Sequence, residues 1–378
     1  MKVLPSFVAP KPFVEEYSTA TLYMFYSEMD WCKRKKSGAL VKKQRLVRGR
    51  ERGEILLEEL IECCDGKSNP IKFFSADDIL KATDNLSECT CVSKLFGHGK
   101  WYSGMLDSHR TILVKKLWRG HPDYPRDFYR GARDIAISSM VSGHKNFMKL
   151  VGCCLEFRFP VIVYYDAKKQ YCRLDLQLML LSWNKRMKIA EEIATALAYL
   201  HTAFSRPLIY RNMYIQNILL GEDGVAKLTD FSNCVLIPQG ETFVKLGFRC
   251  VGGDYDYMDD NYMINGLVSE KTDVFSFGSL MQKLLTGEER FREFYGRDDW
   301  KILEKRKFPN WLSKSIGEGR IDEIVDLKML EKMGEVSEEE RCRMKAFLFL
   351  SERCIGLRGE VPKMVQVVKE LRNSSSGL

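Results

Sequence analysis

The sequence predicts an α+β fold of two lobes, a small β-rich lobe over residues 71–167 and a larger helical lobe over residues 168–373. Two apolar runs of strand length, Ile112–Val114 and Val161–Tyr164, fall in the first lobe, and a long run with helical periodicity, from about Trp183 to His201, opens the second. With 378 residues and ordinary apolar content, the chain can bury a core of this size and carry a short extension.

The first 53 residues are expected to form a basic, disordered arm. Between Cys32 and Gly53 there are ten Lys or Arg residues against one acid, Glu51, which accounts for the whole net charge of +8. The arm is either a solvated segment or a surface for anionic lipid headgroups, with Cys32 beside the Lys33–Lys36 run as a candidate acylation site. No nucleic-acid-binding fold accompanies it, so a nucleic-acid partner is not expected.

A helical extension is expected over residues 54–70. Five apolar residues lie close to one helical stripe, so a short amphipathic helix from Glu54 to Cys64 should pack on the small lobe, with partner docking as the alternative. These residues are Ile55, Leu56, Leu57, Leu60 and Ile61. Residues 374–378 are expected to be a tail.

Several polar landmarks follow one another in a fixed order. They are the Gly-containing stretch Leu95–Gly104, Lys115 at the end of an apolar strand, Tyr210-Arg211-Asn212 with Asn217 after it, Asp230-Phe231-Ser232, and the segment Asp273–Gly278. In this order and at these spacings they resemble the phosphate loop, phosphate-binding lysine, catalytic loop, Asp-Phe-Gly segment and buried large-lobe helix of protein kinases. The fold implied is therefore that of a bilobal kinase.

The resemblance narrows to plant receptor-like cytoplasmic kinases. Residues 74–85 look like the opening of those kinase domains, with Ser75 and Asp78 at capping-box spacing. Residues 149–156 and 268–274 look like their fourth and fifth strands and their entry to the buried helix. The degenerate catalytic loop and eroded Gly loop resemble the HopZ-ETI-deficient-related pseudokinases of subfamily XII, over about residues 55–371.

The catalytic base of this kinase resemblance is missing. Asn212 stands at the position of the Asp that accepts the proton of the substrate hydroxyl, and an amide has no lone pair basic enough for that task. Tyr210 replaces the preceding His, and Tyr214 replaces the usual loop lysine. No intact catalytic residue is expected.

The adenine slot also differs from that of an active kinase. Trp101 and Leu113 align with the Val and Ala that sandwich the base, and both add bulk. Only Gly99 then matches a phosphate-loop glycine, with Lys94 and Phe96 at the other two positions. A one-residue gap would instead make Gly97 and Gly99 the first two glycines, so Leu113 is placed more firmly than Trp101.

The metal end of the pocket is retained. Lys115, Asn217 and Asp230 are the nucleotide-binding candidates, and Asn217 and Asp230 would be magnesium ligands if a nucleotide binds. Alternatively they persist for folding, with Asp134 in place of the usual Glu in a small ion-pair network. No cofactor is expected to be required, and ATP with magnesium remains open.

The substrate platform is expected to be rebuilt. Ser232 replaces a Gly, and the Glu and Arg that usually pair across the large lobe are replaced by Asn261 and Val361. Within the activation segment, about residues 233–270, Gly252-Gly253 would permit rearrangement. Tyr255, Asp256, Tyr257 and Met258 are candidate partner-binding residues. The alternative is that Tyr257 and Met258 fill the large lobe.

Two functions follow from these patterns. The resemblance implies an adaptor that joins the leucine-rich repeats of an NLR immune receptor to receptor-like cytoplasmic kinases modified by bacterial effectors. The alternative is a weakly active serine/threonine kinase with residual ATP binding. With no apolar run of about 20 residues to span a membrane and twelve cysteines without zinc-site spacing, a cytoplasmic protein is expected, peripheral at the plasma membrane if the arm binds lipid.

Overall fold

The structure is a computed structural model that describes residues 38–64, 70–95, 99–117, 126–166, 170–247, 250–252, 255–295 and 307–375. The chain divides after Arg45 into an N-terminal unit and a unit from Leu46 to Leu378 that contains both lobes. Everything below on packing concerns the second unit. Its α+β organisation agrees with the fold class expected from the sequence.

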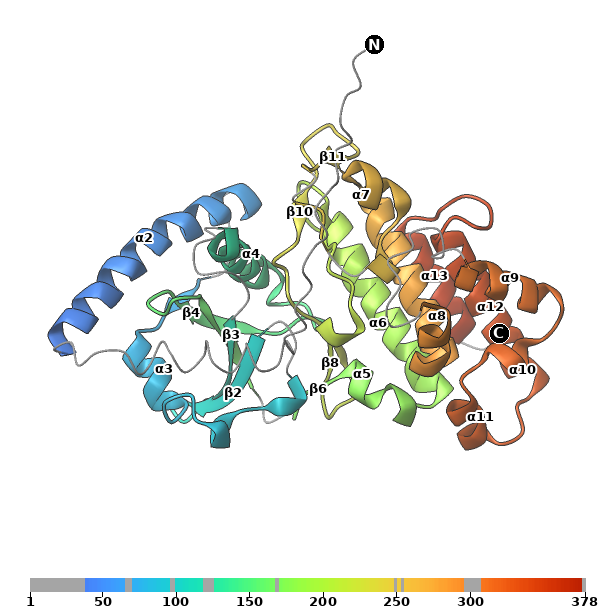
Figure 1. The fold of residues 1–378 in the computed structure, drawn as a ribbon, viewed down its shortest axis with the longest axis horizontal. Helices are drawn as coiled ribbons and strands as arrows, with labels where there is room; N and C mark the ends of the chain where they lie inside the picture. The colour runs from blue at the N-terminus through green and yellow to red at the C-terminus, as the bar shows by residue number, and fades with distance from the viewer. Residues whose placement is uncertain are drawn as a thin grey trace, which may run out of the picture. The chain divides into compact units, whose positions relative to one another are not determined.

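The small lobe is built on a five-stranded sheet with strand order β1-β4-β5-β3-β2 (Figure 1). Its strands are β1 (Lys72–Phe73), β2 (Gly99–Met105), β3 (Thr111–Leu117), β4 (Leu150–Cys154) and β5 (Val161–Tyr165). Strand β3 is buried on both faces, because Ile112 and Val114 join one apolar cluster while Leu113 joins another. This places Lys115, at the end of the apolar run, inside the protein.

Two helices flank this sheet. Helix α3 (Ala76–Ala82) begins with the capping box expected from the sequence, since the Ser75 hydroxyl accepts from the amide of Asp78 and the Asp78 carboxylate accepts from the amide of Ser75. Helix α4 (Arg126–Val141) contributes Ala132 and Ile135 to the cluster that contains Leu113. Asp134 therefore lies on a buried face.

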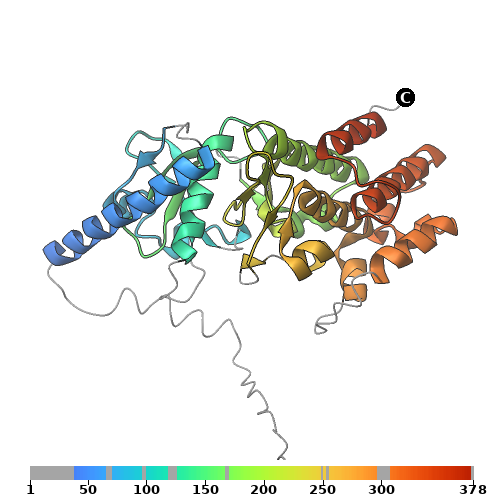
Figure 2. The ribbon, with the colours of Figure 1, turned by 90° about the horizontal axis from the view of Figure 1, so that it is seen from above.

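The large lobe is mostly helical (Figure 2). Its helices are α5 (Leu174–Gln177), α6 (Trp183–Thr202), α7 (Asp260–Asn265), α8 (Glu270–Tyr295), α9 (Lys307–Gly317), α10 (Ile321–Ile324), α11 (Leu327–Met333), α12 (Glu338–Cys354) and α13 (Met364–Ser375). The long helix expected from about Trp183 to His201 is α6, and the expected buried helix at Asp273 is the start of α8. Both expectations are confirmed.

Short elements carry the loops that matter for the site. The strands are β6 (Cys172–Arg173), β7 (Leu208–Ile209), β8 (Ile218–Leu220), β9 (Ala226–Leu228), β10 (Val235–Leu236), β11 (Val244–Lys245) and β12 (Leu267–Val268). The 3₁₀ turns are η1 (Glu88–Thr90), η2 (Ser93–Leu95), η3 (Leu178–Leu180), η4 (Ile215–Asn217) and η6 (Tyr255–Tyr257). The catalytic-loop residues lie between β7 and η4, and the activation segment begins after β9.

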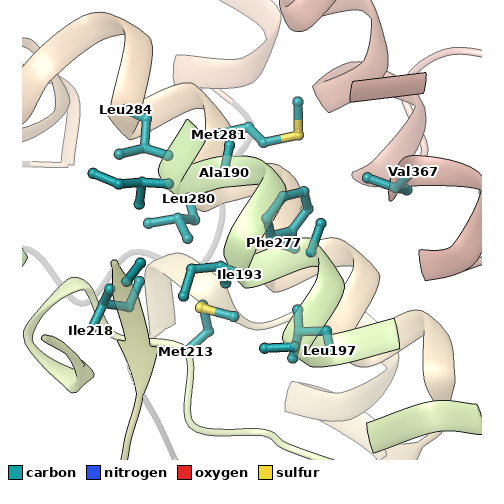
Figure 3. Packing of buried hydrophobic residues seen from close by; sticks show 14 of the residues in the cluster. Ala190, Ile193, Leu197, Met213, Ile218, Phe277, Leu280, Met281, Leu284 and Val367 are labelled. Carbon is teal, nitrogen blue, oxygen red and sulfur yellow. The ribbon is translucent and has the colours of Figure 1, made fainter. Parts of the chain in front are cut away.

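The core of the large lobe forms where α6, α8 and α13 meet (Figure 3). Ile193 and Leu197 of α6 pack with Phe277 and Leu280 of α8, and Val367 of α13 is buried with them. Each such side chain contributes about 1.5–3 kcal/mol when removed from water. This packing fixes the start of α8, on which the catalytic loop rests.

The boundary expected between a disordered arm and a helix at residue 54 is wrong. Helix α2 runs from Gly38 to Cys64, so residues 38–53 are helical. Arg48 donates to the carbonyl of Glu156 and Arg52 to the carbonyl of Leu155, both at 3.2 Å, and the Arg52 guanidinium lies 4.8 Å from the centre of the Phe128 ring. The basic residues are thus partly bound to the small lobe. Residues 1–37, including Cys32, lie outside the described part.

The expected apolar stripe of α2 is only partly used. Leu56 is buried and Leu60 is half-buried, but Leu57 and Ile61 are 57% and 58% exposed. The buried face also holds Glu59, whose carboxylate pairs with Arg133 of α4 at 2.8 Å. An ion pair therefore shares the contact with the small lobe, and Leu57 and Ile61 are turned away from it.

Candidate nucleotide and catalytic site

Lys115 and Asp134 form a buried ion pair at the centre of the site. The Lys115 Nζ lies 3.0 Å from the Asp134 carboxylate, and the two side chains are 3% and 0% exposed. The other Asp134 oxygen accepts from the backbone amide of Phe231 at 3.0 Å. Asp134 thus takes the part expected for the shorter acid of the third kinase helix, and it ties α4 to the start of the activation segment.

Burial acts on the pKa values of Asp134 and Lys115 in opposite directions. Burial raises the pKa of Asp134, although the Lys115 ammonium lowers it. Burial alone would lower the pKa of Lys115, but attraction by the Asp134 and Asp230 carboxylates outweighs burial and raises it. We favour the ionised pair, because three donors surround Asp134: the Lys115 ammonium, the Phe231 amide and the Ser138 hydroxyl.

Trp101, the residue expected to add bulk at the adenine position, is buried beside Lys115. In the sheet register it stands opposite Lys115, and its indole is 3% exposed. The ring stacks on Tyr164 with centroids 5.7 Å apart and planes 25° apart, and the Lys115 Nζ is 5.8 Å from its centre. This register places Trp101 on the same face as Lys115. Gly97 and Phe96 lie outside the described residues.

A pocket of about 1000 Å³ remains at the mouth of the cleft. Leu113, Tyr171, Ile189 and Leu220 contribute to its walls, and Lys94 lies at its rim. None of the three nucleotide-binding candidates is among the residues that line it. The walls of this pocket are therefore formed by residues other than Lys115, Asn217 and Asp230.

The side chain of Asn212 is fully engaged. Its amide nitrogen donates to the backbone carbonyl of Asp230 at 2.8 Å, and its amide oxygen accepts from the side-chain nitrogen of Asn233 at 3.0 Å. Arg130 donates to the other end of the Asn233 amide. A base at this position would point toward a substrate hydroxyl, whereas here the activation segment occupies the acceptor.

The two expected magnesium ligands have structural contacts of their own. Asn217 donates from its side-chain nitrogen to the carbonyl of Asn212 at 2.9 Å. One Asp230 oxygen accepts from the Ser232 hydroxyl at 2.6 Å, and Asp230 has a φ of +66°. Among the described residues there is no group of three or more His, Cys, Asp or Glu side chains that could hold a metal ion. Bracing of the loop is therefore sufficient to explain both side chains.

Tyr210 and Arg211 join the catalytic loop to the large lobe. Their backbone amides donate to the buried carboxylate of Asp273 at 2.7 and 2.9 Å, and the Tyr210 hydroxyl donates to the carbonyl of Thr229 at 2.5 Å. His201 also lies 2.9 Å from Asp273. Tyr210 thus anchors the loop through its backbone and hydroxyl, in place of the usual imidazole.

The Arg211 side chain holds the activation segment. It donates to the carbonyls of Asn233 and Cys250 at 2.7 and 2.8 Å and to the Tyr262 hydroxyl at 2.5 Å. Tyr262 in turn donates to the carbonyl of Gly252 and accepts from its amide. Our sequence reasoning missed the contacts of Asn233, Tyr262 and Tyr164, because these contacts join segments that no local motif connects.

The interpretation of Tyr257 and Met258 as exposed partner-binding residues is wrong. Each is only 4% exposed, and Tyr257 belongs to the large-lobe core, with its ring 6.5 Å from that of Tyr214. They fill the large lobe, as the alternative stated. Asp256 is half-buried, and the side chain of Tyr255 lies outside the described set.

The two altered platform positions leave no buried charge behind. Asn261 is exposed on α7, and Val361 is half-buried against the large-lobe core. Asp259, two residues before Asn261, caps α7 by accepting from the Tyr262 amide at 3.0 Å. Gly252 is held by Tyr262, and Gly253 lies outside the described residues.

The family of the chain is established by comparison with known proteins. Residues 97–348 match the family model of the protein kinase domain. The Arabidopsis thaliana non-functional pseudokinase ZRK15 is 60% identical over 365 residues, which cover 92% of this chain and 98% of the relative. The Arabidopsis thaliana non-functional pseudokinase ZED1 is 40% identical over 327 residues, covering 85% of this chain and 94% of the relative. The chain belongs to the HopZ-ETI-deficient-related pseudokinase family.

Names within this pseudokinase family are not uniform. The Arabidopsis thaliana serine/threonine-protein kinase ZRK4 is 45% identical over 356 residues, covering 90% of this chain and 96% of the relative. The names of the relatives therefore do not decide whether this chain has kinase activity. No helix of the part of the chain that the structure describes is long and apolar enough to cross a membrane.

Proposed function

We propose that this pseudokinase is a non-catalytic adaptor of plant immunity, which links an NLR immune receptor to kinases that pathogen effectors have modified. The observation that carries the loss of catalysis is the side chain of Asn212. Its donor is committed to Asp230 and its acceptor to Asn233. A substrate hydroxyl would meet no base there.

General-base help is typically worth about 10²–10⁴-fold in rate, so the missing base alone would not abolish phosphotransfer. The bulk of the Trp101 indole, which stacks on Tyr164 and has the Lys115 ammonium 5.8 Å from its centre, adds a second, independent obstacle in this proposal. The alternative, a weak kinase with residual ATP binding, would rest on Lys115 and Asp230. Both of those groups have structural partners.

The adaptor role rests on the family resemblance and on what the fold leaves at its surface. The activation segment is held by Arg211 and Tyr262, so it presents a defined surface. On that segment Phe243 and Ile264 are 48% and 63% exposed. In this proposal these side chains contact the modified client kinase, and the leucine-rich repeats of the receptor bind elsewhere on the chain. Bacterial effectors act on the client or on the adaptor itself.

The proposal includes a cytoplasmic location, with peripheral contact of the arm at the plasma membrane. Arg48 and Arg52 are bound to the small lobe, and in this proposal the lysines that precede them in the chain contact anionic lipid. Juxtamembrane Lys or Arg residues are each worth about 1 kcal/mol at such a surface. ATP with magnesium is not required for the adaptor role.

Phosphotransfer tests the catalytic part of the proposal. Purified protein with Mg²⁺ and radiolabelled ATP should incorporate no more phosphate than the Asp230→Ala variant, both into itself and into a general substrate such as myelin basic protein. Phosphate incorporation above that of the Asp230→Ala control, if Lys115→Ala abolishes it, would support the weak-kinase alternative and contradict the proposal.

Affinity purification from plant tissue tests the adaptor part. A tagged chain should recover an NLR receptor in resting tissue and additional receptor-like cytoplasmic kinases after effector expression. Mass spectrometry identifies both classes, and a tagged active kinase of the same subfamily serves as the control. Recovery of kinases without any receptor, or of neither class, would contradict the link that the proposal makes.

A further inference from the structure

The indole of Trp101 has the position and shape of a nucleotide base. Indole and purine are both planar fused rings of five and six members. In an active kinase the base lies between the side chains that Trp101 and Leu113 replace. Here the ring stacks on Tyr164 at 5.7 Å and lies under the Lys115 ammonium at 5.8 Å. Stacking of this kind is worth about 0.5–1.5 kcal/mol beyond the area buried.

The indole belongs to a cluster that contains residues of both lobes. Leu95 and Leu113 of the small lobe and Leu219 of β8 in the large lobe are buried in this cluster with Trp101. All four are at most 4% exposed. In an active kinase with no nucleotide bound, these walls would face an open slot, whereas here they pack with the indole, and Leu95 and Leu113 also line the pocket of about 1000 Å³. The chain therefore supplies from β2 the apolar group that a nucleotide would otherwise bring.

Three hydrogen bonds also join the two lobes. The Phe231 amide donates to Asp134 at 3.0 Å, the Leu228 amide donates to the carbonyl of Asn146 at 2.8 Å, and the Asn146 side chain donates to the carbonyl of Ala226 at 2.9 Å. These bonds need the two lobes close together. Nothing in the set requires a bound phosphate or metal.

We propose that Trp101 is a built-in substitute for the adenine base, which holds the two lobes together in the absence of any nucleotide. The surfaces that depend on the closed lobes are then presented whatever the concentration of ATP. This inference concerns the conformation of the protein and stands independently of the adaptor role.

Two variants of Trp101 test the proposal. Trp101→Val introduces the side chain of active kinases, and Trp101→Gly leaves a cavity the size of an indole. Trp183→Gly is the matched control, because Trp183 is also buried, at 2% exposure, but packs against Phe347 inside the large lobe. Hydrogen exchange of the Phe231 and Leu228 amides, taken relative to the core amide of Leu280, reports the contact between the lobes.

In Trp101→Gly these two amides should exchange at least about tenfold faster relative to Leu280, since local opening no longer breaks the packing of the indole. Free indole at millimolar concentration should restore their protection and raise the melting temperature by roughly 2–4 °C. Free indole should not change the melting temperature of the unsubstituted protein. Trp183→Gly should lose stability without a selective change in the two amides.

The double variant Trp101→Val with Leu113→Ala keeps the test decisive if Trp101→Gly does not fold. With both walls trimmed, adenosine should raise its melting temperature and slow exchange of the same two amides, whereas adenosine should leave the unsubstituted protein unchanged. The proposal is overturned if the Phe231 and Leu228 amides stay protected in the Trp101 variants, or if adenosine or ATP stabilises the unsubstituted protein strongly at sub-millimolar concentration.

Discussion

The side-chain amide of Asn212 donates to the backbone carbonyl of Asp230 at 2.8 Å. A carboxylate cannot make this bond, because it has no hydrogen to donate at neutral pH. The residue that replaces the catalytic base is thus integrated into the fold and joins the catalytic loop to the start of the activation segment. The side-chain oxygen of Asn212 accepts from Asn233, and the side-chain oxygen of Asn233 accepts from Arg130. These hydrogen bonds form a continuous chain from the Asp230 carbonyl to the Arg130 guanidinium.

Asn212→Asp should fail to restore phosphotransfer and should lower the free energy of unfolding by about 1–3 kcal/mol, since a buried carboxylate oxygen would face the Asp230 carbonyl. Urea denaturation and a phosphotransfer assay check both parts. Asn265→Asp, on the exposed end of α7, is the matched control and should leave stability unchanged. A stable, active Asn212→Asp protein would contradict the assigned hydrogen bonds.

Lys115→Ala should destabilise the protein by about 3–5 kcal/mol, because it leaves the Asp134 carboxylate buried without its cation. Adding Asp134→Asn should recover part of the loss, since an amide oxygen can still accept from Phe231. The exposed pair of Lys81 and Asp107 offers a control, and Lys81→Ala should change stability little. A small effect of Lys115→Ala would mean that the pair is not structural.

The pH dependence of this pair follows from the raised pKa of Lys115. A raised folded-state pKa contributes stability that is fully present below the unfolded value of 10.5 and is lost as pH rises through the folded value. The difference in unfolding free energy between the unsubstituted protein and the double variant Lys115→Ala with Asp134→Asn, in which neither position can titrate, should therefore be flat from about pH 6 to pH 9. A difference that grows or shrinks across this range, measured by urea denaturation at each pH, would show that the pair titrates there.

Phe243→Ala combined with Ile264→Ala should weaken binding of a modified client kinase without changing the melting temperature, because both side chains are exposed on the activation segment. Interface aromatic residues commonly cost more than about 1 kcal/mol on truncation, which is roughly a fivefold to tenfold loss of affinity. Leu357→Ala, with Leu357 38% exposed near α13, is the control. Unchanged client binding would place the sensing surface elsewhere.

Neutralising the arm should test the membrane part of the proposal. Replacing Lys33, Arg34, Lys35 and Lys36 with Gln should reduce binding to vesicles that contain anionic lipid, and raising the salt concentration should do the same for the unsubstituted chain. Cys32→Ser separates acylation from charge in plant membrane fractions. If the neutralised chain binds vesicles as strongly as the unsubstituted chain, the arm does not bind lipid through these charges.

The sequence by itself determined the fold class, the family and the loss of the base. Landmarks such as Lys115, Asn212 and Asp230 are read by order and spacing, and these are properties of the chain that need no coordinates. The capping box at Ser75 and Asp78 was predictable for the same reason, since all of its atoms lie within one turn.

Only the tertiary structure decided what the altered residues do. Whether Tyr257 is a surface anchor or a core residue depends on α8 and Tyr214, which are distant in sequence. The contacts of α2 with the small lobe likewise depend on carbonyls more than a hundred residues away that accept from Arg48 and Arg52. The packing of the Trp101 indole depends on Tyr164 and Lys115, which two other strands bring to its ring. Contacts between distant segments are set by close packing of the whole core, and no local pattern records them.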